Sequence, residues 1–371
     1  MSLSGRPSGR PTGRLGDLVA ALPQRYAWLA DRAVLLHLGV LAALLAAQLA
    51  LSDYAILSLA RVMVLAVYAI GYNILFGYTG LLSLGHAMLF AAGLYGAGLS
   101  AAQLSFGAPA AFLFGIGAGF VLSVAFGLIA LRTSGVAFMI VTLMFAQAGY
   151  LTSLYFADYT RGDEGFVLRG DIRRAALPGG LSLDLANPVV RYNLALALLA
   201  VCLIGCLALV RSPVGRVLVA IRENEERTRM LGYDTQANKL LAFVLSGTVA
   251  AAAGAAYALL FAYVGATFAS IQYSILPLLW VLLGGAGTVL GPLVGTLLMF
   301  YLVDVTSSPH TLETIVTTAF GPALGERLMA YLVHVTNAYM LVVGVALLVL
   351  VVWFPKGLLG TLRERVAPWL P

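Results

Sequence analysis

The sequence predicts an all-α fold, a polytopic transmembrane bundle of eight to ten helices, most simply about ten, with discontinuous glycine-rich segments. Of the 371 residues, 61% are hydrophobic and only 10% are charged, whereas about a quarter of a soluble domain is charged. The mean hydropathy is +0.95. Apolar runs of about 20 residues, the length that crosses a hydrocarbon core, recur along the chain. This composition excludes a disordered chain, a coiled coil and an ordinary cytosolic enzyme.

Eight apolar runs have the length of one crossing, and a ninth run is long enough to be divided. The eight runs are 33–51, 54–76, 84–103, 108–131, 135–156, 192–210, 240–264 and 335–354. The ninth run, 271–303, is interrupted by Pro277 and by glycines between Gly284 and Gly291. It therefore predicts two helices. The basic N-terminal residues precede a run that exceeds a signal-peptide core of about 7–15 residues, so we expect a retained first span.

The distribution of basic residues predicts the orientation. Ten crossings place four segments in the cytoplasm, namely 1–32, the turn at 132, the loop 211–239 and the tail 355–371. They place 157–191 and 304–334 outside, and the transmembrane domain is 33–354. The cytoplasmic segments then hold 15 Lys and Arg residues and the exterior ones six, as the positive-inside rule requires. Both termini are expected in the cytoplasm, and the net charge of +6 reflects loop topology rather than binding to nucleic acid.

The loop 211–239 carries signals for a helix. Ser212 suits an N-cap, Gly232 suits the position after a helix, and Asp234 suits the cap of the next span. Three apolar residues fall at helical spacing: Val217, Leu218 and Ile221. We expect one short amphipathic helix over 213–231. From charge alone, the loop is either a solvated connector or a helix that docks on a cytoplasmic partner.

Several stretches between about residue 70 and residue 360 carry a family resemblance. They read GYTGLLSLGHAMLF at 77–90, AIRENEERTRMLGYD at 220–234, KLLAFVLS at 239–246, GGAGTVLGPLVG at 284–295 and FPKGLLG at 354–360. Together they resemble the bacterial ABC importer permeases of the branched-chain amino acid type, a LivM-like family that also has urea-type members. The sequence departs from the usual pattern in two places. Thr228–Arg229 stands where many relatives carry small residues such as alanine, and Arg161 stands where glycine is usual.

The resemblance implies a permease subunit in the bacterial inner membrane that translocates a small polar solute, with branched-chain or other amino acids expected. It implies four kinds of partner: a homologous second permease (LivH-type), two ATPase subunits (LivG/LivF-type), a periplasmic solute-binding protein that meets the loop 157–191, and the lipid bilayer. The loop 211–239 then contains the coupling helix. The candidate ATPase contacts on that match are Arg222, Glu223, Glu225, Gly232 and Tyr233.

ATP hydrolysis is expected to belong to partner subunits. The sequence has no G-x-x-x-x-G-K-[ST] phosphate loop, so ATP and Mg²⁺ would bind in the ATPases and this chain would need no cofactor. We therefore do not expect an enzyme. No second His, Cys or acidic residue stands at metal-ligand spacing from His86, so no metal site is expected.

Polar residues within the predicted spans are candidates for the translocation path. They are Arg61, Asn73, Thr79, Ser83, His86 and Gln147. These side chains either satisfy backbone groups freed at the glycine breaks or contact the solute. Arg61 lies roughly 10 Å into its span. It snorkels, pairs with Asp53 or Asp304, or attracts the carboxylate of a solute.

Glycines at intervals of four predict close helix packing. Gly287, Gly291 and Gly295 would line one face if the segment is helical, either for packing or for a seam with the second permease. The pair Gly115 and Gly119 predicts packing alone.

Other functions remain open at this point. The same machinery could carry urea or short amides, or aromatic or dicarboxylic acids. A self-contained secondary transporter is a further alternative, although no span has an Asp or Glu in its interior, which argues against proton coupling. A membrane-embedded enzyme has no acid, metal or nucleophile constellation to support it. The sequence does not choose the solute or decide whether the permease pair is a homodimer or a heterodimer.

Overall fold

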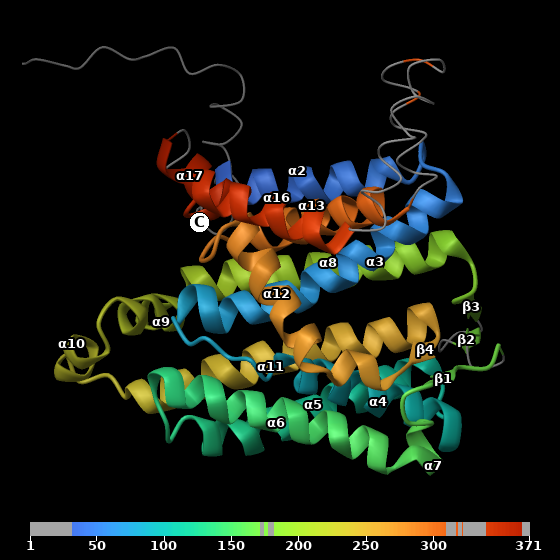
Figure 1. The fold of residues 1–371 in the computed structure, drawn as a ribbon, viewed down its shortest axis with the longest axis horizontal. Coiled ribbons are helices and arrows are strands. Elements are labelled where there is room, and N and C mark those ends of the chain that lie inside the picture. Colours follow the sequence, from blue (N-terminus) through green and yellow to red (C-terminus); the bar gives the residue numbers. More distant parts are fainter. Residues whose placement is uncertain are drawn as a thin grey trace, which may run out of the picture.

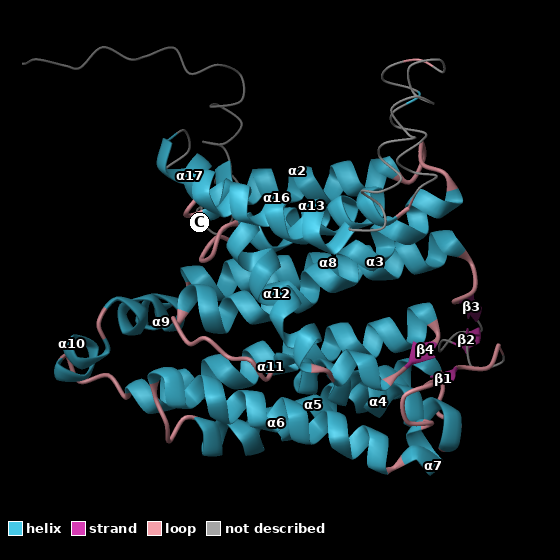
Figure 2. Cartoon of the chain, viewed as in Figure 1, coloured by secondary structure: helices cyan, strands magenta, loops and turns pink. Residues whose placement is uncertain are grey.

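The computed structural model of the chain describes residues 32–170, 174–176, 182–308, 317, 321 and 339–365. Within these ranges the fold is almost wholly helical (Figure 2), so the predicted helical class is confirmed. The predicted basic segment 1–32, apart from its last residue, lies outside the described residues, as do most of 304–334 and the last six residues.

Long helices follow the predicted spans closely. They are α2 (Arg32–Ala47), α3 (Asp53–Asn73), α4 (His86–Gln103), α5 (Ala108–Ala130), α6 (Gly135–Tyr155), α8 (Pro188–Arg211), α11 (Thr235–Phe261), α12 (Ile271–Gly284), α13 (Gly291–Ser307) and α16 (Tyr339–Trp353). In the described part of the chain, six helical segments are long and apolar enough to cross a membrane. The chain is thus a multi-pass membrane protein. α2, α12 and α13 are shorter apolar helices.

The burial pattern of α5 shows how these helices pack. Its buried face is made of small residues: Ala108, Ala111, Gly115, Gly119, Ser123, Gly127 and Ala130. Its exposed face carries large apolar side chains such as Leu113 and Phe120. Small residues let backbones approach in lipid, and large apolar ones face the hydrocarbon. A Cβ on Gly119 would lie 2.1 Å from that of Ala251, so the packing predicted for this glycine is confirmed.

The helices form two groups (Figure 1), which meet where α3 packs against α11 and where α12 lies between them. One group contains α4, α5, α6 and α11, and the other contains α2, α3, α8, α13 and α16. α3 is the most enclosed span, because α8, α11, α12 and α13 all pack against it. The short helices α9 (Pro213–Glu223), α10 (Glu225–Met230) and α17 (Gly357–Arg365) lie at one end of the bundle. We name this the loop end.

The opposite end carries the strands and the helix α7 (Ala157–Thr160), and we name it the strand end. β1 (Phe166–Val167) pairs antiparallel with β4 (Tyr263–Val264), and β2 (Arg174–Ala176) pairs with β3 (Ser182–Asp184). The first pair ties the segment after α7 to the end of α11. Arg161 has φ +62, a left-handed conformation that favours glycine, which explains why glycine suits this position.

Two breaks interrupt the spans. α3 continues through a π-helical turn, η2 (Ile74–Tyr78), and residues 79–85 then run without helix to α4. The second break, 285–290, separates α12 from α13, as predicted for this long run. Pro277, which we expected to contribute to the interruption, instead lies inside α12. The glycines alone end the helix.

The loop between α8 and α11 differs from the prediction in one respect. The single helix expected over 213–231 is wrong, because the loop forms two helices. Asn224 leaves the helix with φ −162, and its side chain accepts a hydrogen bond from Arg227 N at 2.8 Å to cap α10. The predicted caps are confirmed, since Ser212 Oγ accepts from Gly215 N at 3.1 Å and Asp234 Oδ1 from Ala237 N at 3.0 Å.

Candidate functional site at the glycine breaks

Asn73 joins the two breaks to each other. Its side chain is completely buried at the end of α3. Nδ2 donates to the carbonyl oxygen of Thr288 at 2.9 Å, and Oδ1 accepts from the backbone N–H of Gly287 at 3.0 Å. One amide therefore satisfies a donor and an acceptor that the second break leaves free, as buried backbone groups require. These two breaks, about 215 positions apart, form one structural unit.

The glycines at this contact allow the backbones to meet. A Cβ on Gly77 would lie 1.9 Å from Asn73 Oδ1 and 2.6 Å from Gly287 N. Gly287 has φ +76 and its backbone lies against Gly77. Any side chain at Gly77 would push the breaks apart. We call the contact between η2 and residues 285–290 the junction.

Arg222 extends from α9 into the junction. Its Nη1 donates a hydrogen bond to the carbonyl oxygen of Gly77, and the same atom lies 2.9 Å from where a Cβ on Gly287 would stand. From α17, Arg363 Nη1 donates to the carbonyl oxygen of Gly287 at 3.4 Å. A guanidinium suits these carbonyls, because the C-terminal end of a helix carries partial negative charge. Two helices of the loop end thus each hold one break.

The non-helical segment 79–85 has its backbone groups satisfied by neighbouring side chains. Ser83 O accepts from Tyr72 Oη at 3.0 Å, and Leu84 N donates to Thr142 Oγ1 at 3.1 Å. Thr79 Oγ1 donates to Ile74 O at 3.0 Å, and Ser83 Oγ accepts from Gly85 N at 3.2 Å. Irregular backbone is tolerated at membrane depth only where protein or a water-filled path surrounds it. Within the segment, Thr79, Ser83 and Gly85 are buried, whereas Gly80 is exposed.

His86 begins α4 and connects three helices. Its Nε2 lies 2.7 Å from Ser246 Oγ on α11, and Ser246 Oγ donates to Gly71 O on α3 at 2.6 Å. Because the serine hydrogen points to Gly71, the serine oxygen accepts from Nε2–H. His86 is fully buried and acts here as a packing and hydrogen-bonding residue. No group of three metal-binding side chains occurs in the described ranges.

Glu225 fastens α10 to the start of α11. Its carboxylate lies 2.5 Å from Lys239 Nζ and 3.1 Å from Arg229 Nη2, and Thr235 Oγ1 donates to it at 3.1 Å. Partial burial by itself raises the pKa of Glu225. The hydrogen bond and charge of Lys239, the Thr235 hydroxyl and the charge of Arg229 outweigh that effect and hold the pKa below its ordinary value.

The tip of the loop exposes apolar side chains. Met230 is 85% exposed, Leu231 72% and Tyr233 50%, and Glu223 and Gly232 are also exposed. We call Met230, Leu231 and Tyr233 the tip patch. Sequence reasoning selected Tyr233 but missed Met230 and Leu231. The available signal was two adjacent apolar residues at the end of a charged helix. Such a patch on a small loop is typical of a protein contact.

Comparison with known proteins identifies the family. Residues 54–352 match the family described as "Branched-chain amino acid transport system / permease component". The chain belongs to this family. It is 28% identical over 326 residues, which are 82% of this chain and 69% of the relative, to the "High-affinity branched-chain amino acid transport system permease protein LivM" of Escherichia coli (strain K12).

Two further relatives agree with this assignment. The LivM protein of Salmonella typhimurium is 27% identical over the same shares of both chains. The "Probable branched-chain amino acid transport permease protein LivM" of Methanocaldococcus jannaschii is 34% identical over 90 residues, 24% of this chain and 26% of the relative. No solved structure matches the chain. The predicted family resemblance is therefore confirmed.

Two further candidates for the translocation path of this permease, Gln147 and Arg61, lie away from the junction. Gln147 is half-buried on α6. Arg61 is exposed on α3, and its guanidinium lies 5.3 Å from the ring centre of Phe261. The expected ion pair with Asp53 or Asp304 is not among the pairs of the described residues. Asp304 instead accepts a hydrogen bond from Tyr54 Oη at 3.0 Å.

The predicted glycine stripe is wrong for Gly287. Gly287 lies in the break rather than in a helix, whereas Gly291 and Gly295 belong to α13. A Cβ on Gly295 would lie 1.8 Å from Trp280 O, and one on Gly291 would lie 2.5 Å from Gly285 O. These two glycines therefore pack α13 on α12 and its break, within the chain.

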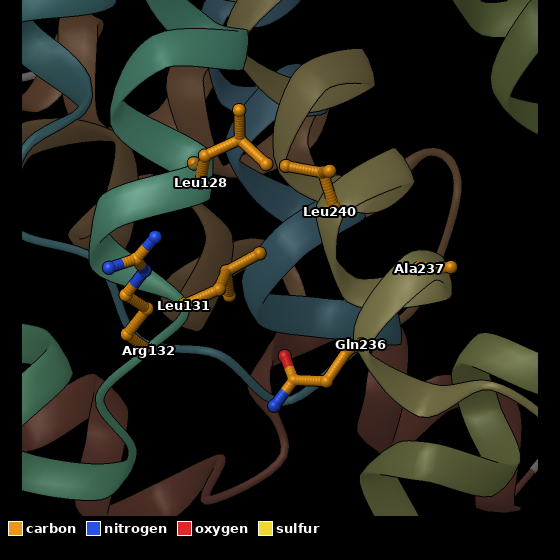
Figure 3. Close-up of a pocket in the computed structure, with 7 residues that line it drawn as sticks. Leu128, Leu131, Arg132, Gln236, Ala237 and Leu240 are labelled. Atoms are coloured by element: carbon orange, nitrogen blue, oxygen red, sulfur yellow. The ribbon is translucent and has the colours of Figure 1, made fainter.

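A hollow of about 280 Å³ lies at the loop end between α5 and α11 (Figure 3). Its membrane side carries leucines, including Leu131 and Leu240, and its rim carries Arg132 and Gln236. In Figure 3 the guanidinium of Arg132 points away from α11. Because its polar groups do not converge, we assign no solute to it.

Acidification is expected to release the tip of the loop. The pKa of Glu225 is lowered in the folded protein, so its ion pairs stabilise the loop at neutral pH. That contribution is lost as the pH falls below the ordinary glutamate pKa of about 4.3 and through the folded value. A nitroxide label on Met230→Cys should become more mobile over this range. In Glu225→Gln the label should be mobile already at pH 7, while Glu226→Gln, which alters an exposed carboxylate, should behave like the parent. An unchanged label in Glu225→Gln would contradict the assignment.

Proposed function

We propose that this permease is the membrane-spanning subunit of an ATP-binding-cassette importer in a bacterial inner membrane. It translocates a small polar solute, with branched-chain or other amino acids as the expected class. A periplasmic binding protein delivers the solute, and separate ATPase subunits drive the cycle. The name of the transport system that the relatives carry supports amino acids over urea, short amides, and aromatic or dicarboxylic acids.

The proposed orientation places the loop end in the cytoplasm and the strand end in the periplasm. Ten crossings, made by the six long apolar segments together with α2, α4, α12 and α13, would put both termini on the cytoplasmic side. The positive charges support this orientation, because Arg132, the arginines of α9 and α10, and Arg363 gather at the loop end. ATP and Mg²⁺ belong to the ATPase subunits, since the sequence has no phosphate-binding loop of its own.

One observation carries the proposal: α9 reaches the membrane breaks through Arg222, while the tip patch beyond it stays open for a partner. A docked ATPase that moves the tip patch would move α9 with it. Arg222 would then pull on the carbonyl of Gly77 and on the junction. The loop ends of α3 and α12 meet at the junction, so their displacement opens the seam between this permease and its LivH-type partner on one side of the membrane.

The tip patch provides the direct test. Leu231→Asp is expected to weaken co-purification of the ATPase subunits about tenfold or more, because it puts a charge into an apolar contact. Insertion into the membrane should be unchanged. Val167→Asp is the matched control, since Val167 is 71% exposed on β1 at the strand end. Normal ATPase binding by Leu231→Asp, or uptake by the purified chain without ATPases, would contradict the proposal and favour a secondary transporter.

A further inference from the structure

A positively charged side chain, Arg61, is exposed on α3, the span that the bundle encloses most. Tyr54, Ser58 and Arg61 share one face of α3, because residues three, four or seven apart align on a helix. All three are exposed or half-buried. The next residues on this face, Leu65 and Tyr68, are only 8% and 0% exposed. The accessible face thus begins at the strand end and stops at Arg61.

The guanidinium of Arg61 has no carboxylate partner in the part of the chain that the structure describes. It lies 5.3 Å from the ring centre of Phe261, a cation–π arrangement. That contact with the ring face leaves the N–H donors free, since a guanidinium has five of them at its edge. A carboxylate is the group that accepts two parallel N–H bonds from such an edge. The chemistry therefore favours a carboxylate ligand.

Aromatic rings close the inner side of this position. Phe261 contacts Tyr257 at a ring-centre distance of 4.8 Å, Tyr257 contacts Phe268 at 4.8 Å, and Phe268 contacts Tyr273 at 5.0 Å. Tyr273 stacks on Tyr68 at 5.7 Å. The buried hydroxyl of Tyr273 has no hydrogen-bond partner in the described residues. A buried polar atom without a partner is costly, and these rings give the wall a mainly apolar character.

We propose that Arg61 and this aromatic wall form an entry subsite for an amino acid with an apolar side chain. Arg61 binds the carboxylate, and the rings of Phe261 and Tyr257 contact the side chain. The inference rests on the proposed function, whose orientation places the strand end where the binding protein releases the solute. The site is open and screened by water, which keeps it weak. Weak binding suits passage, because a tight site would retain the solute.

A cysteine reporter tests binding without transport. Ser58→Cys lies one turn outward from Arg61 on the same face. In proteoliposomes that hold the assembled transporter without binding protein, an impermeant methanethiosulfonate reagent is expected to modify it from the strand end. L-leucine should slow the reaction about threefold at about twice its dissociation constant. L-leucinamide, which has no carboxylate, should not. The unsubstituted chain, with Cys202 half-buried and Cys206 buried on α8, gives the background.

Arg61 is then substituted in the protein that carries Ser58→Cys. Adding Arg61→Gln should remove the protection by leucine, while Arg61→Lys should retain part of it. Three results with the reporter would overturn the subsite: a Ser58→Cys that does not react, equal protection by leucine and leucinamide, or protection that survives Arg61→Gln. The subsite would also be overturned if Ser58→Cys were shielded without leucine, by anionic phospholipid or by an acidic residue of the second permease.

A transport assay separates this inference from the proposed function. With binding protein and ATP, Arg61→Gln should lower the maximal rate of radiolabelled leucine uptake about tenfold, equivalent to about 1.4 kcal/mol. Arg132→Gln, which alters an exposed arginine at the loop end, should not. An unchanged rate in Arg61→Gln would overturn the subsite. If the unaltered transporter shows no ATP-dependent uptake of leucine although leucine protects Ser58→Cys, the proposed function fails and the subsite stands.

Discussion

Replacing Arg222 with glutamine is expected to lower uptake about tenfold or more while the assembled transporter continues to hydrolyse ATP. Arg222 is the side chain of α9 that donates to the carbonyl of Gly77, so its loss disconnects the loop from the junction. Hydrogen bonds that involve a charged group contribute about 1.5–3 kcal/mol, which corresponds to a loss of transport of about tenfold or more. The measurement is the ratio of solute transported to ATP hydrolysed in proteoliposomes.

Two companion variants distinguish coupling from folding. Arg216→Gln removes the same charge from the same helix, at an exposed position, and should leave the ratio near that of the parent. Arg222→Lys keeps a donor and should restore part of the uptake. A Gln variant that transports normally would show that α9 does not act through Gly77. A variant that loses ATP hydrolysis and uptake together would point to failed assembly instead.

Asn73→Leu should give the largest loss of stability. Leucine branches at the same carbon as asparagine but cannot hydrogen-bond, so it leaves Gly287 N and Thr288 O without partners in a buried contact. Each unsatisfied buried group costs about 1–3 kcal/mol, so for the two groups we expect a loss of about 2–6 kcal/mol and a melting temperature several degrees lower. The measurement is the thermal loss of monodisperse protein in detergent.

Asn193→Leu is the matched control for Asn73→Leu. Asn193 is exposed on α8, and its amide donates only to Val189 O within its own helix, at 2.9 Å. Its replacement should change the melting temperature little. Equal melting temperatures for the Asn73 variant and the parent would mean that the two breaks are not held together by this side chain.

Local signals predicted the helices well. Apolar runs gave the long helices within a few residues, and Ser212 and Asp234 cap the helices that their side-chain chemistry suggested. The loop prediction was wrong where a local signal was overlooked. Asn224, which was read as part of a continuous helix, caps a second one.

Local sequence patterns could not predict the junction. Asn73 and Arg222 were selected for separate reasons, one as a polar residue in a span and the other as an ATPase contact. Both side chains meet the same pair of glycine segments, a contact between positions far apart in sequence. Nothing in the spacing of either motif specifies the other. The exposed tip patch was predicted only in part. Tyr233 was a candidate contact, whereas Met230 and Leu231 were not, because adjacent apolar residues are more often buried than exposed.

The amino-acid sequence alone determined that this permease is a membrane protein. It also determined which stretches are helical and which family the chain belongs to, because the length of hydrophobic runs and the order of motifs are properties of the linear chain. Only the tertiary structure decided that Asn73 binds the backbone of the second break, that Arg222 turns toward Gly77, and that Arg61 lies beside Phe261 with no carboxylate partner among the described residues. The physical reason is that hydrogen bonding depends on which donor and acceptor atoms approach within about 3 Å, and packing across the whole bundle sets those approaches.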